Sequence, residues 1–186
     1  MNFWEKAECG REIFIDGKTI YEGKIIDLKV DRVKLDDGRT AIREVARHRP
    51  AVTILAESGN GEVALVRQCR YAAGEIMLEL PAGIVEDGED PEFTAIRELQ
   101  EEVGFKPARL EKIADLFTSP GFSDERITMF YATGLAKSAL LPDDDEFLTS
   151  GFVSRSAAEE LLSSGMIRDC KTMAGLLWWF RRLGKG

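Results

Sequence analysis

The chain has 186 residues, of which 44% are hydrophobic, and its formal net charge at pH 7 is −8. This length is sufficient for one well-cored domain with a small additional segment. The negative charge argues against a general affinity for nucleic acids or anionic membranes, because both bind basic surfaces. We therefore expect neither kind of partner.

Cysteine content and the chain ends indicate the compartment. The three cysteines, Cys9, Cys69 and Cys170, are an odd number at no metal-ligand spacing, which favours reduced thiols and a cytoplasmic protein. The first dozen residues are charged and contain no apolar signal-peptide core. The apolar run 173–180 is far shorter than the roughly 20 residues of a membrane span. We interpret it as part of a core helix.

The N-terminal quarter predicts a small antiparallel sheet. Short β-type runs lie between residues 12 and 45, separated by the turn signals Asp16-Gly17 and Asp36-Asp37-Gly38. We expect residues 1–46 to form an N-terminal β-segment and residues 47–186 to form the main domain.

A second β-rich block begins after Pro50. The turn sequence Ser58-Gly59-Asn60-Gly61 predicts a hairpin between two of its strands. The expected strands of this block cover residues 51–56, 62–67, 75–80, 113–117 and 127–135.

The first predicted helix covers residues 91–103. Asp90 is its expected N-cap, and Pro91 occupies the first helical position, where proline is favoured. Gly104 follows the last helical residue, where glycine commonly ends a helix.

Two further helices are predicted towards the C-terminus. Ser156 and Glu159 have capping-box spacing, which predicts a helix from Ser156 to Gly165. Another is expected over residues 171–183. Helices among mixed strands indicate an α+β fold, with a sheet sandwiched between helices.

The first helix carries an unusual acid face. At about 100° per residue, Glu98, Glu101 and Glu102 share one side of the helix. Each like-charge pair costs on the order of 3 kcal/mol at about 5 Å and an effective dielectric near 20. The opposite side is the expected core face: Phe93, Ile96, Leu99 and Val103.

This acid face lacks an opposite charge, and we expect a cation to supply it. Clustered carboxylates with no His or Cys nearby suit Mg²⁺ or Mn²⁺. The alternative interpretation is a solvated charged face without a ligand.

Residues 83–105, GIVEDGEDPEFTAIRELQEEVGF, match every specified position of the pattern G-x5-E-x7-R-E-U-x-E-E-x-G-U, in which U is apolar. The stretch resembles the Nudix box. This resemblance implies a Nudix-like α/β/α sandwich whose loop–helix–loop holds divalent metal against a diphosphate. It also implies hydrolysis of a nucleoside diphosphate linked to another moiety.

The resemblance assigns roles within the box. Glu98 and Glu102 are the implied principal metal ligands, Glu101 is a shared or water-mediated ligand, and Ala82 offers its backbone carbonyl. Glu101 and Glu102 are accordingly counted with the catalytic group.

The remaining box residues have implied supporting roles. Arg97, four residues before Glu101, is expected to orient a box carboxylate. Glu89 is expected either to tie the loop to the helix or to hold an outer metal. Gly83 and Gly104 are expected to allow a tight turn and a left-handed helix cap, respectively.

Further segments resemble the ADP-ribose pyrophosphatase branch, which hydrolyses nucleoside diphosphate sugars. Cys69 departs from this branch, which commonly has an aromatic residue there, and Pro120 matches a proline that marks it. The resembling segments are Arg43-Glu44, Arg67 to Arg70, Leu78 to Gly83, Ser119 to Glu125 and Arg168 to Thr172.

The branch resemblance implies Mg²⁺-dependent cleavage of ADP-ribose to AMP and ribose 5-phosphate. GDP-mannose or another ADP-sugar is an alternative substrate of the same chemistry. A non-catalytic regulator that binds ADP-ribose is the alternative from a different class.

Five residues are candidate substrate contacts. Arg43 and Arg70 suit phosphate or ribose oxygens, although each could instead form a surface ion pair. Tyr21 is the candidate for stacking on the base, or it packs within the N-terminal sheet. Glu79 either faces a cleft or is the buried partner of an arginine. Glu125, the last residue of the segment from Ser119, is the fifth candidate substrate contact.

A general base is expected from the acidic loop 142–146, because the resembling branch takes its base from a loop after the box. Glu146 is the first choice, with Asp144 or Asp145 second, and a merely solvated loop is the alternative. The only histidine, His48, is interpreted as structural.

The N-terminal sheet is too small to bury much surface alone. In the resembling branch such a segment crosses to a second subunit. We therefore expect a homodimer in which the partner contributes Tyr21 and Arg43 to each site.

Overall fold

The computed structural model describes residues 10–140 and 147–183. The chain divides into two compact units. The N-terminal unit consists of residues up to Arg49 together with the segment Ser119–Glu125, and the main unit consists of Pro50–Thr118 and the residues from Arg126 onwards.

The N-terminal unit contains the predicted antiparallel sheet, in the order β1-β2-β3. Its strands are β1 (Ile13–Glu22), β2 (Ile26–Lys34) and β3 (Thr40–His48). Gly38 has a φ of 86°, so the turn predicted at residues 36–38 is confirmed.

The turn predicted at Asp16-Gly17 is wrong, because both residues lie inside β1 and Gly17 pairs with Asp31. A Cβ on Gly17 would lie 2.1 Å from Asp31 Oδ1, so close strand packing is the reason for this glycine. The chain turns instead after Glu22, where Gly23 N donates to Ile26 O at 3.1 Å.

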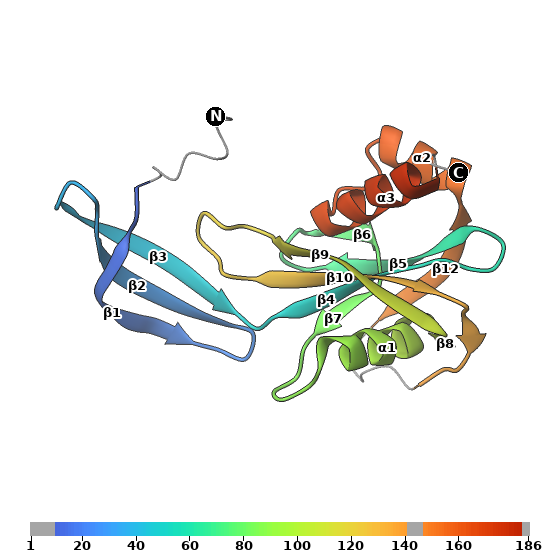
Figure 1. Cartoon of the computed structure of the whole chain (residues 1–186), viewed down its shortest axis with the longest axis horizontal. Helices are drawn as coiled ribbons and strands as arrows, with labels where there is room; N and C mark the ends of the chain where they lie inside the picture. The colour runs from blue at the N-terminus through green and yellow to red at the C-terminus, as the bar shows by residue number, and fades with distance from the viewer. Residues whose placement is uncertain (1–9, 141–146, 184–186) are drawn as a thin grey trace. The chain divides into compact units, whose positions relative to one another are not determined.

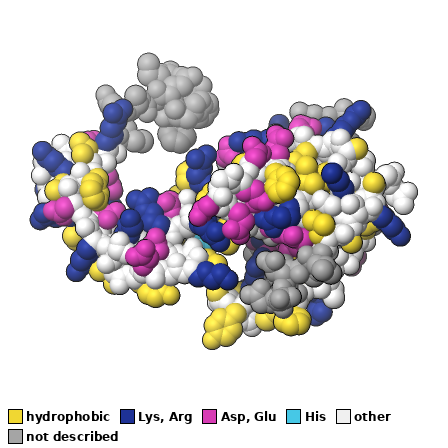
Figure 2. Space-filling model, turned by 90° about the horizontal axis from the view of Figure 1, so that it is seen from below, with side chains coloured by type: hydrophobic (Ala, Val, Ile, Leu, Met, Phe, Trp, Pro, Cys, Tyr) yellow, Lys and Arg dark blue, Asp and Glu magenta, His cyan; other side chains and the backbone are white. Residues whose placement is uncertain are grey.

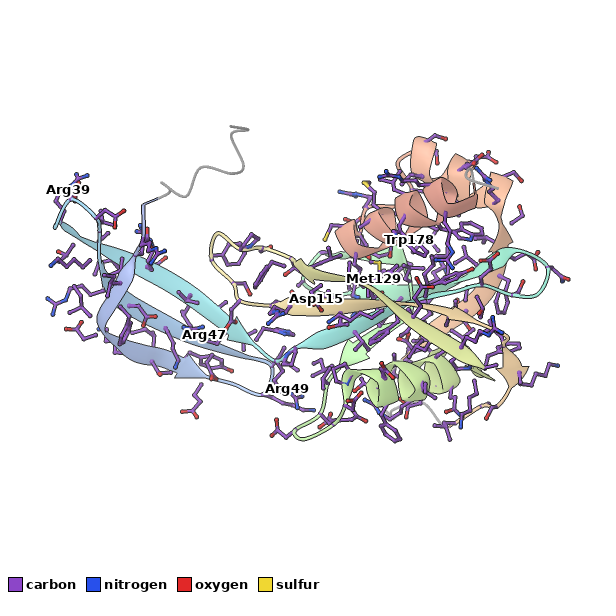
Figure 3. All side chains as sticks on the ribbon, in the orientation of Figure 1. Arg39, Arg47, Arg49, Asp115, Met129 and Trp178 are labelled. Carbon is purple, nitrogen blue, oxygen red and sulfur yellow. The ribbon has the colours of Figure 1, made fainter. Side chains whose placement is uncertain are left out.

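The segment Ser119–Glu125 joins this sheet at the end of β3. Ala46 N donates to Phe122 O at 2.8 Å, and Arg47, labelled in Figure 3, holds Asp124 at 2.8 Å through Nη1. Asp124 Oδ1 also accepts from His48 N at 2.9 Å. These three hydrogen bonds fasten this distant segment to β3.

The main unit has two principal sheets and a short two-stranded ladder. The order β7-β4-β10-β9 is mixed, because β4 and β10 are parallel whereas the other pairs are antiparallel. The order β12-β5-β6 is antiparallel throughout, and β11 pairs with β8. The strands are β4 (Ala51–Ala56), β5 (Glu62–Arg70), β6 (Glu75–Glu79), β7 (Ala82–Ile84), β8 (Phe105–Lys106), β9 (Arg109–Phe117), β10 (Arg126–Thr133), β11 (Ala136–Lys137) and β12 (Leu148–Ser154).

All five strands expected in the main domain are present. β4 has the expected ends, and each of the other four differs from its expected range at one or both ends. Sequence reasoning missed β7, β8, β11 and β12. β8 and β11 have only two residues each, and a glycine occupies the centre of β7 (Gly83) and of β12 (Gly151), so none shows a clear alternating pattern.

Among the described residues, three helices cover the strands of the main unit: α1 (Pro91–Glu102), α2 (Arg155–Ser163) and α3 (Cys170–Leu183). Figure 1 shows α1 on one side of the strands and α2 with α3 on the other. The predicted α+β sandwich is therefore confirmed. The expected cap of α2 is wrong by two residues, because Ser154 rather than Ser156 accepts from Ala157 N.

Each helix layer packs against the strands and forms its own hydrophobic cluster with them. Ala95 and Leu99 of α1 pack with Val52, Ile54 and Phe130 of the mixed sheet. On the other side, Leu176 and Trp179 of α3 are fully buried. They pack with the strand residues Leu55, Val63 and Leu65 and with Leu80, which follows β6. Trp178, labelled in Figure 3, places its ring 5.3 Å from that of Tyr131 on β10.

Within the described residues, no helix has the length and apolar content that a membrane span requires.

Candidate active site

The buried face of α1 differs from the predicted one. Leu99 is fully buried as expected, but Phe93 is 61% exposed, whereas Glu98 and Glu102 are only 6% and 5% exposed. The prediction that all three carboxylates lie opposite the core is therefore wrong. The helix turns Glu98 and Glu102 towards β7, where the neighbouring strand has room for them.

Gly83 provides that room. A Cβ built on Gly83 would lie 2.0 Å from both Cδ and Oε1 of Glu98. Gly83 lies in β7 opposite Val52, so the expected tight turn is wrong, and the physical reason for glycine is the carboxylate seated on its backbone. Gly104, by contrast, has a φ of 82°, which confirms the left-handed cap.

Arg97 supplies the positive charge that the acid face was expected to lack. Its Nη1 donates to Glu98 Oε1 at 2.7 Å and to Glu101 Oε2 at 2.9 Å. Hydrogen bonds to Glu89 and the nearby charge of Glu98 raise the pKa of Arg97 despite partial burial. The guanidinium therefore holds box carboxylates in fixed positions, as its spacing predicted.

Glu89 fastens the preceding loop to α1. Its carboxylate accepts from Arg97 Nε and Nη2, each at 3.1 Å, from Thr94 Oγ1 at 2.7 Å and from Glu86 N at 3.2 Å. The hydrogen bonds from Arg97 are the main cause that lowers the pKa of Glu89 to about 2. Of the two roles expected for Glu89, the structure shows the tie between loop and helix.

Glu102 lies next to the loop end that precedes the box. Its Oε2 accepts from Ala82 N at 3.0 Å, which places a buried carboxylate beside the backbone of Ala82. Figure 2, viewed from the side on which α1 lies in Figure 1, shows acidic side chains gathered around basic ones on this face of the main unit.

The donor set of this face fits a hard divalent cation, because Glu98, Glu101 and Glu102 offer carboxylate oxygens. In the described part of the chain, however, no three His, Cys, Asp or Glu side chains surround a common point closely enough to form a ready metal group. Arg97 occupies oxygens of Glu98 and Glu101. Metal binding here would require these side chains to share or exchange their contacts with Arg97.

A second ionic group lies where β6 ends. Glu79, 1% exposed, accepts from Arg70 Nε at 2.7 Å and Nη2 at 2.8 Å, and it also pairs with Lys171. Burial by itself would raise the pKa of Glu79, but the two cations outweigh it and hold the pKa at about 2. Of the two expectations for Glu79, the structure therefore shows the buried arginine partner.

Lys171 was missed as a site residue. The segment Arg168 to Thr172 carried a resemblance but no assigned role, and its only signal was a polar cluster at the start of a helix. The fold brings Lys171 against Glu79, 92 residues away in the sequence.

Three candidate contacts lie in the N-terminal unit. Arg43 forms an ion pair with Glu12, with Nε and Oε2 2.9 Å apart, so its ion-pair alternative is the one seen. Tyr21 is 58% exposed on β1, with its ring edge over Gly23. Glu125 lies near His48, with 3.8 Å between Oε1 and Nδ1. The expected general base, Glu146, lies outside the described residues, as do Asp144 and Asp145.

Comparisons with known proteins agree with this architecture. Residues 47–169 match the model of the NUDIX domain, and residues 15–46 match the nucleoside diphosphate sugar hydrolase N-terminal domain. The fold is similar to that of a crystal structure titled ADP compounds hydrolase, with a TM-score of 0.83 over 95% of each chain at 21% identity.

Curated relatives are similar over most of their length. An ADP-ribose pyrophosphatase of Bacillus subtilis (strain 168) is 41% identical over 83% of this chain and 85% of its own. A methanol dehydrogenase activator of Bacillus methanolicus is 37% identical over 86% and 87%, respectively. An ADP-ribose pyrophosphatase of Mycobacterium tuberculosis (strain ATCC 25618 / H37Rv) is 36% identical over 88% and 80%. Nudix hydrolases generally use a divalent metal ion. With an intact box on α1 and matches along its length, the chain belongs to the Nudix family and is a Nudix pyrophosphatase.

Proposed function

We propose that this enzyme hydrolyses the diphosphate bond of ADP-ribose, or of a related nucleoside diphosphate sugar, with Mg²⁺ and yields AMP and ribose 5-phosphate. The observation that carries the proposal is the group around Arg97, in which Glu89, Glu98 and Glu101 share one guanidinium beside the backbone of Gly83. The two relatives called ADP-ribose pyrophosphatase support the choice of substrate.

The carboxylates of the box form the proposed binding site of the cation. Glu98 and Glu102 are its main ligands, Glu101 is a shared ligand, and Ala82 contributes its carbonyl oxygen. Mn²⁺ suits the same oxygen donors. When bound, the ion supplies charge neutralisation for the diphosphate and a lowered pKa for the attacking water.

The protein groups then position the reactants. Arg97 holds Glu98 and Glu101 at fixed distances, so that carboxylate repulsion does not disperse them. Arg70 is proposed to bind a phosphate oxygen. Glu146 is proposed as the base that takes a proton from water attacking one phosphorus in line with the departing phosphate.

The N-terminal unit is proposed to serve a homodimer. Its β1 bears several exposed apolar side chains, which a second subunit could cover: Ile13, Phe14, Ile15, Ile20 and Tyr21. In that assembly the partner contributes Tyr21 to stack on the base, with Arg43 and Glu125 as further substrate contacts. Gel filtration that shows a monomer at micromolar concentration would contradict this assembly.

Two alternative functions can be tested in the same experiment. GDP-mannose or another ADP-sugar requires the same diphosphate chemistry but a different base or sugar contact. We also propose that the protein is cytoplasmic. A regulator that binds ADP-ribose without hydrolysing it is the alternative from another class, and the relative named methanol dehydrogenase activator gives it a specific basis.

A substrate panel distinguishes these functions. The purified chain is incubated with Mg²⁺ and ADP-ribose, GDP-mannose, NADH or dinucleoside polyphosphates, and phosphate is measured after phosphatase treatment. The proposal expects the highest kcat/KM for ADP-ribose. Tight binding of ADP-ribose without turnover would support the regulator, and preference for GDP-mannose would support the other hydrolase.

A further inference from the structure

The buried ionic group at the end of β6 is larger than a simple ion pair, because two further charged residues join Arg70 and Glu79. Glu79 Oε2 contacts both Arg70 Nη2 and Lys171 Nζ. Lys171 Nζ also lies 3.0 Å from Asp169 Oδ2. Lys171 is almost fully buried, so it is itself out of reach of a substrate.

Arg70 differs from Lys171 in its exposure. Its side chain is 41% exposed, and among the described residues its hydrogen bonds use only Nε and Nη2, both directed to Glu79. This bidentate contact fixes the plane of the guanidinium. One edge is thereby held by the protein while the rest of the group faces outwards.

The surroundings of Arg70 are strongly acidic. Glu79, Glu102 and Asp169 all act on it electrostatically. A guanidinium surrounded by three carboxylates is a poor binder of anions unless a second cation offsets part of that charge. Lys171 is the cation placed between two of these three carboxylates.

The start of α3 holds Lys171 in place. Asp169 Oδ2 accepts from Thr172 N at 2.9 Å and from Thr172 Oγ1, while Thr172 Oγ1 accepts from Leu80 N at 2.7 Å. The same segment therefore joins α3 to the chain immediately before Ala82 and Gly83. Lys171 is fixed relative to both β6 and the start of the box.

We propose that Lys171 is a positioning residue for the diphosphate-binding action of Arg70: it offsets the charge of Glu79 and Asp169 and fixes the carboxylate on which Arg70 is seated. This inference rests on the proposed function in taking the anion to be a diphosphate and Arg70 to be its contact. It adds a residue of α3 to the determinants of substrate affinity.

Binding of inorganic pyrophosphate tests the inference without requiring turnover. Isothermal titration calorimetry of the full chain compares wild type with Lys171→Met, Lys171→Arg and Arg168→Met. Arg168 is the matched control, since it is a cation of the same segment with a single exposed ion pair to Glu75. The expected Kd rises about tenfold in Lys171→Met, and it stays within about twofold in Arg168→Met.

The double variant Arg70→Met, Lys171→Met separates positioning from a general loss of structure. Since Lys171 acts through Arg70, the double variant is expected to bind pyrophosphate no more weakly than Arg70→Met alone. Independent, additive losses would overturn the inference. So would an unchanged Kd in Lys171→Met, whatever the natural substrate is.

Two conservative variants keep the test open if Lys171→Met does not fold. Lys171→Arg retains the charge and should restore the Kd to within about threefold of wild type. Asp169→Asn keeps the cap on Thr172 but removes one carboxylate near Arg70, so pyrophosphate should bind about twofold to threefold more tightly. Weaker binding by folded Asp169→Asn would overturn the charge compensation.

With ADP-ribose as substrate, Lys171→Met is expected to raise KM about tenfold and to change kcat less than about threefold. A fall in kcat with unchanged KM would overturn the positioning role. If wild type hydrolyses no ADP-ribose but the pyrophosphate results hold, the proposed substrate fails while the inference about Lys171 stands.

Discussion

Replacing Gly83 by alanine tests whether the strand backbone under Glu98 sets the geometry of the active site. The new Cβ would lie 2.0 Å from Cδ and Oε1 of Glu98 and 2.5 Å from Oε2. Ordinary contact requires the carboxylate to retreat by more than about 1 Å. Arg97 already holds Oε1 at 2.7 Å, so this retreat also disturbs the guanidinium and its contact with Glu101.

Two magnitudes follow from this clash. Overpacking of this kind costs about 1–3 kcal/mol of unfolding free energy. Displacement of a site group by about 1 Å lowers kcat roughly 100-fold. Gly83→Ala should therefore remain folded while losing most of its turnover.

The assay measures hydrolysis of ADP-ribose by coupled phosphate release, with urea unfolding in parallel. Gly151→Ala is the matched control, because Gly151 lies on β12 with nothing within 4 Å of the added Cβ. Wild-type kcat in folded Gly83→Ala, at the same metal concentration, would show that the backbone of Gly83 does not set the position of Glu98.

Three further outcomes are expected. Glu102→Gln keeps the side-chain shape beside Ala82 N but removes a charge. Turnover should therefore fall about 1,000-fold while the circular dichroism spectrum stays unchanged. Unchanged activity would show that Glu102 is not part of the metal site. In Arg97→Lys, a single ammonium cannot bridge the several carboxylates that the guanidinium holds. The Mg²⁺ concentration at half-maximal rate should therefore rise about tenfold. An unchanged metal titration would contradict the bridging role. The lowered pKa of Glu79 contributes about 3 kcal/mol of stability that is present above pH 4.5 and lost as the pH falls towards 2. The difference in unfolding free energy between wild type and Glu79→Gln should therefore shrink over this range, and a constant difference would count against the ion pair.

Local sequence signals are sufficient to predict several elements of this fold. Capping and periodicity predicted α1 within one residue of its ends, and turn residues predicted the chain reversal between β4 and β5. The hairpin expected there is wrong, because β4 and β5 belong to different sheets and an isolated bridge joins Glu57 to Val63 instead. The spacing within residues 83–105 was sufficient to indicate the family, because it records which residues one helix and one loop must bring together. Arg97 and Glu101 are likewise neighbours through helical spacing alone.

The buried face of α1 and the reason for glycine at position 83 depend on tertiary packing. Helical periodicity groups side chains on a face, but the packed neighbour determines whether that face meets water or protein. Here β7 presents a residue without a side chain, so Glu98 lies against it and Phe93 is turned outwards. The pairing of Lys171 with Glu79 joins residues 92 positions apart, and no local pattern encodes such a contact.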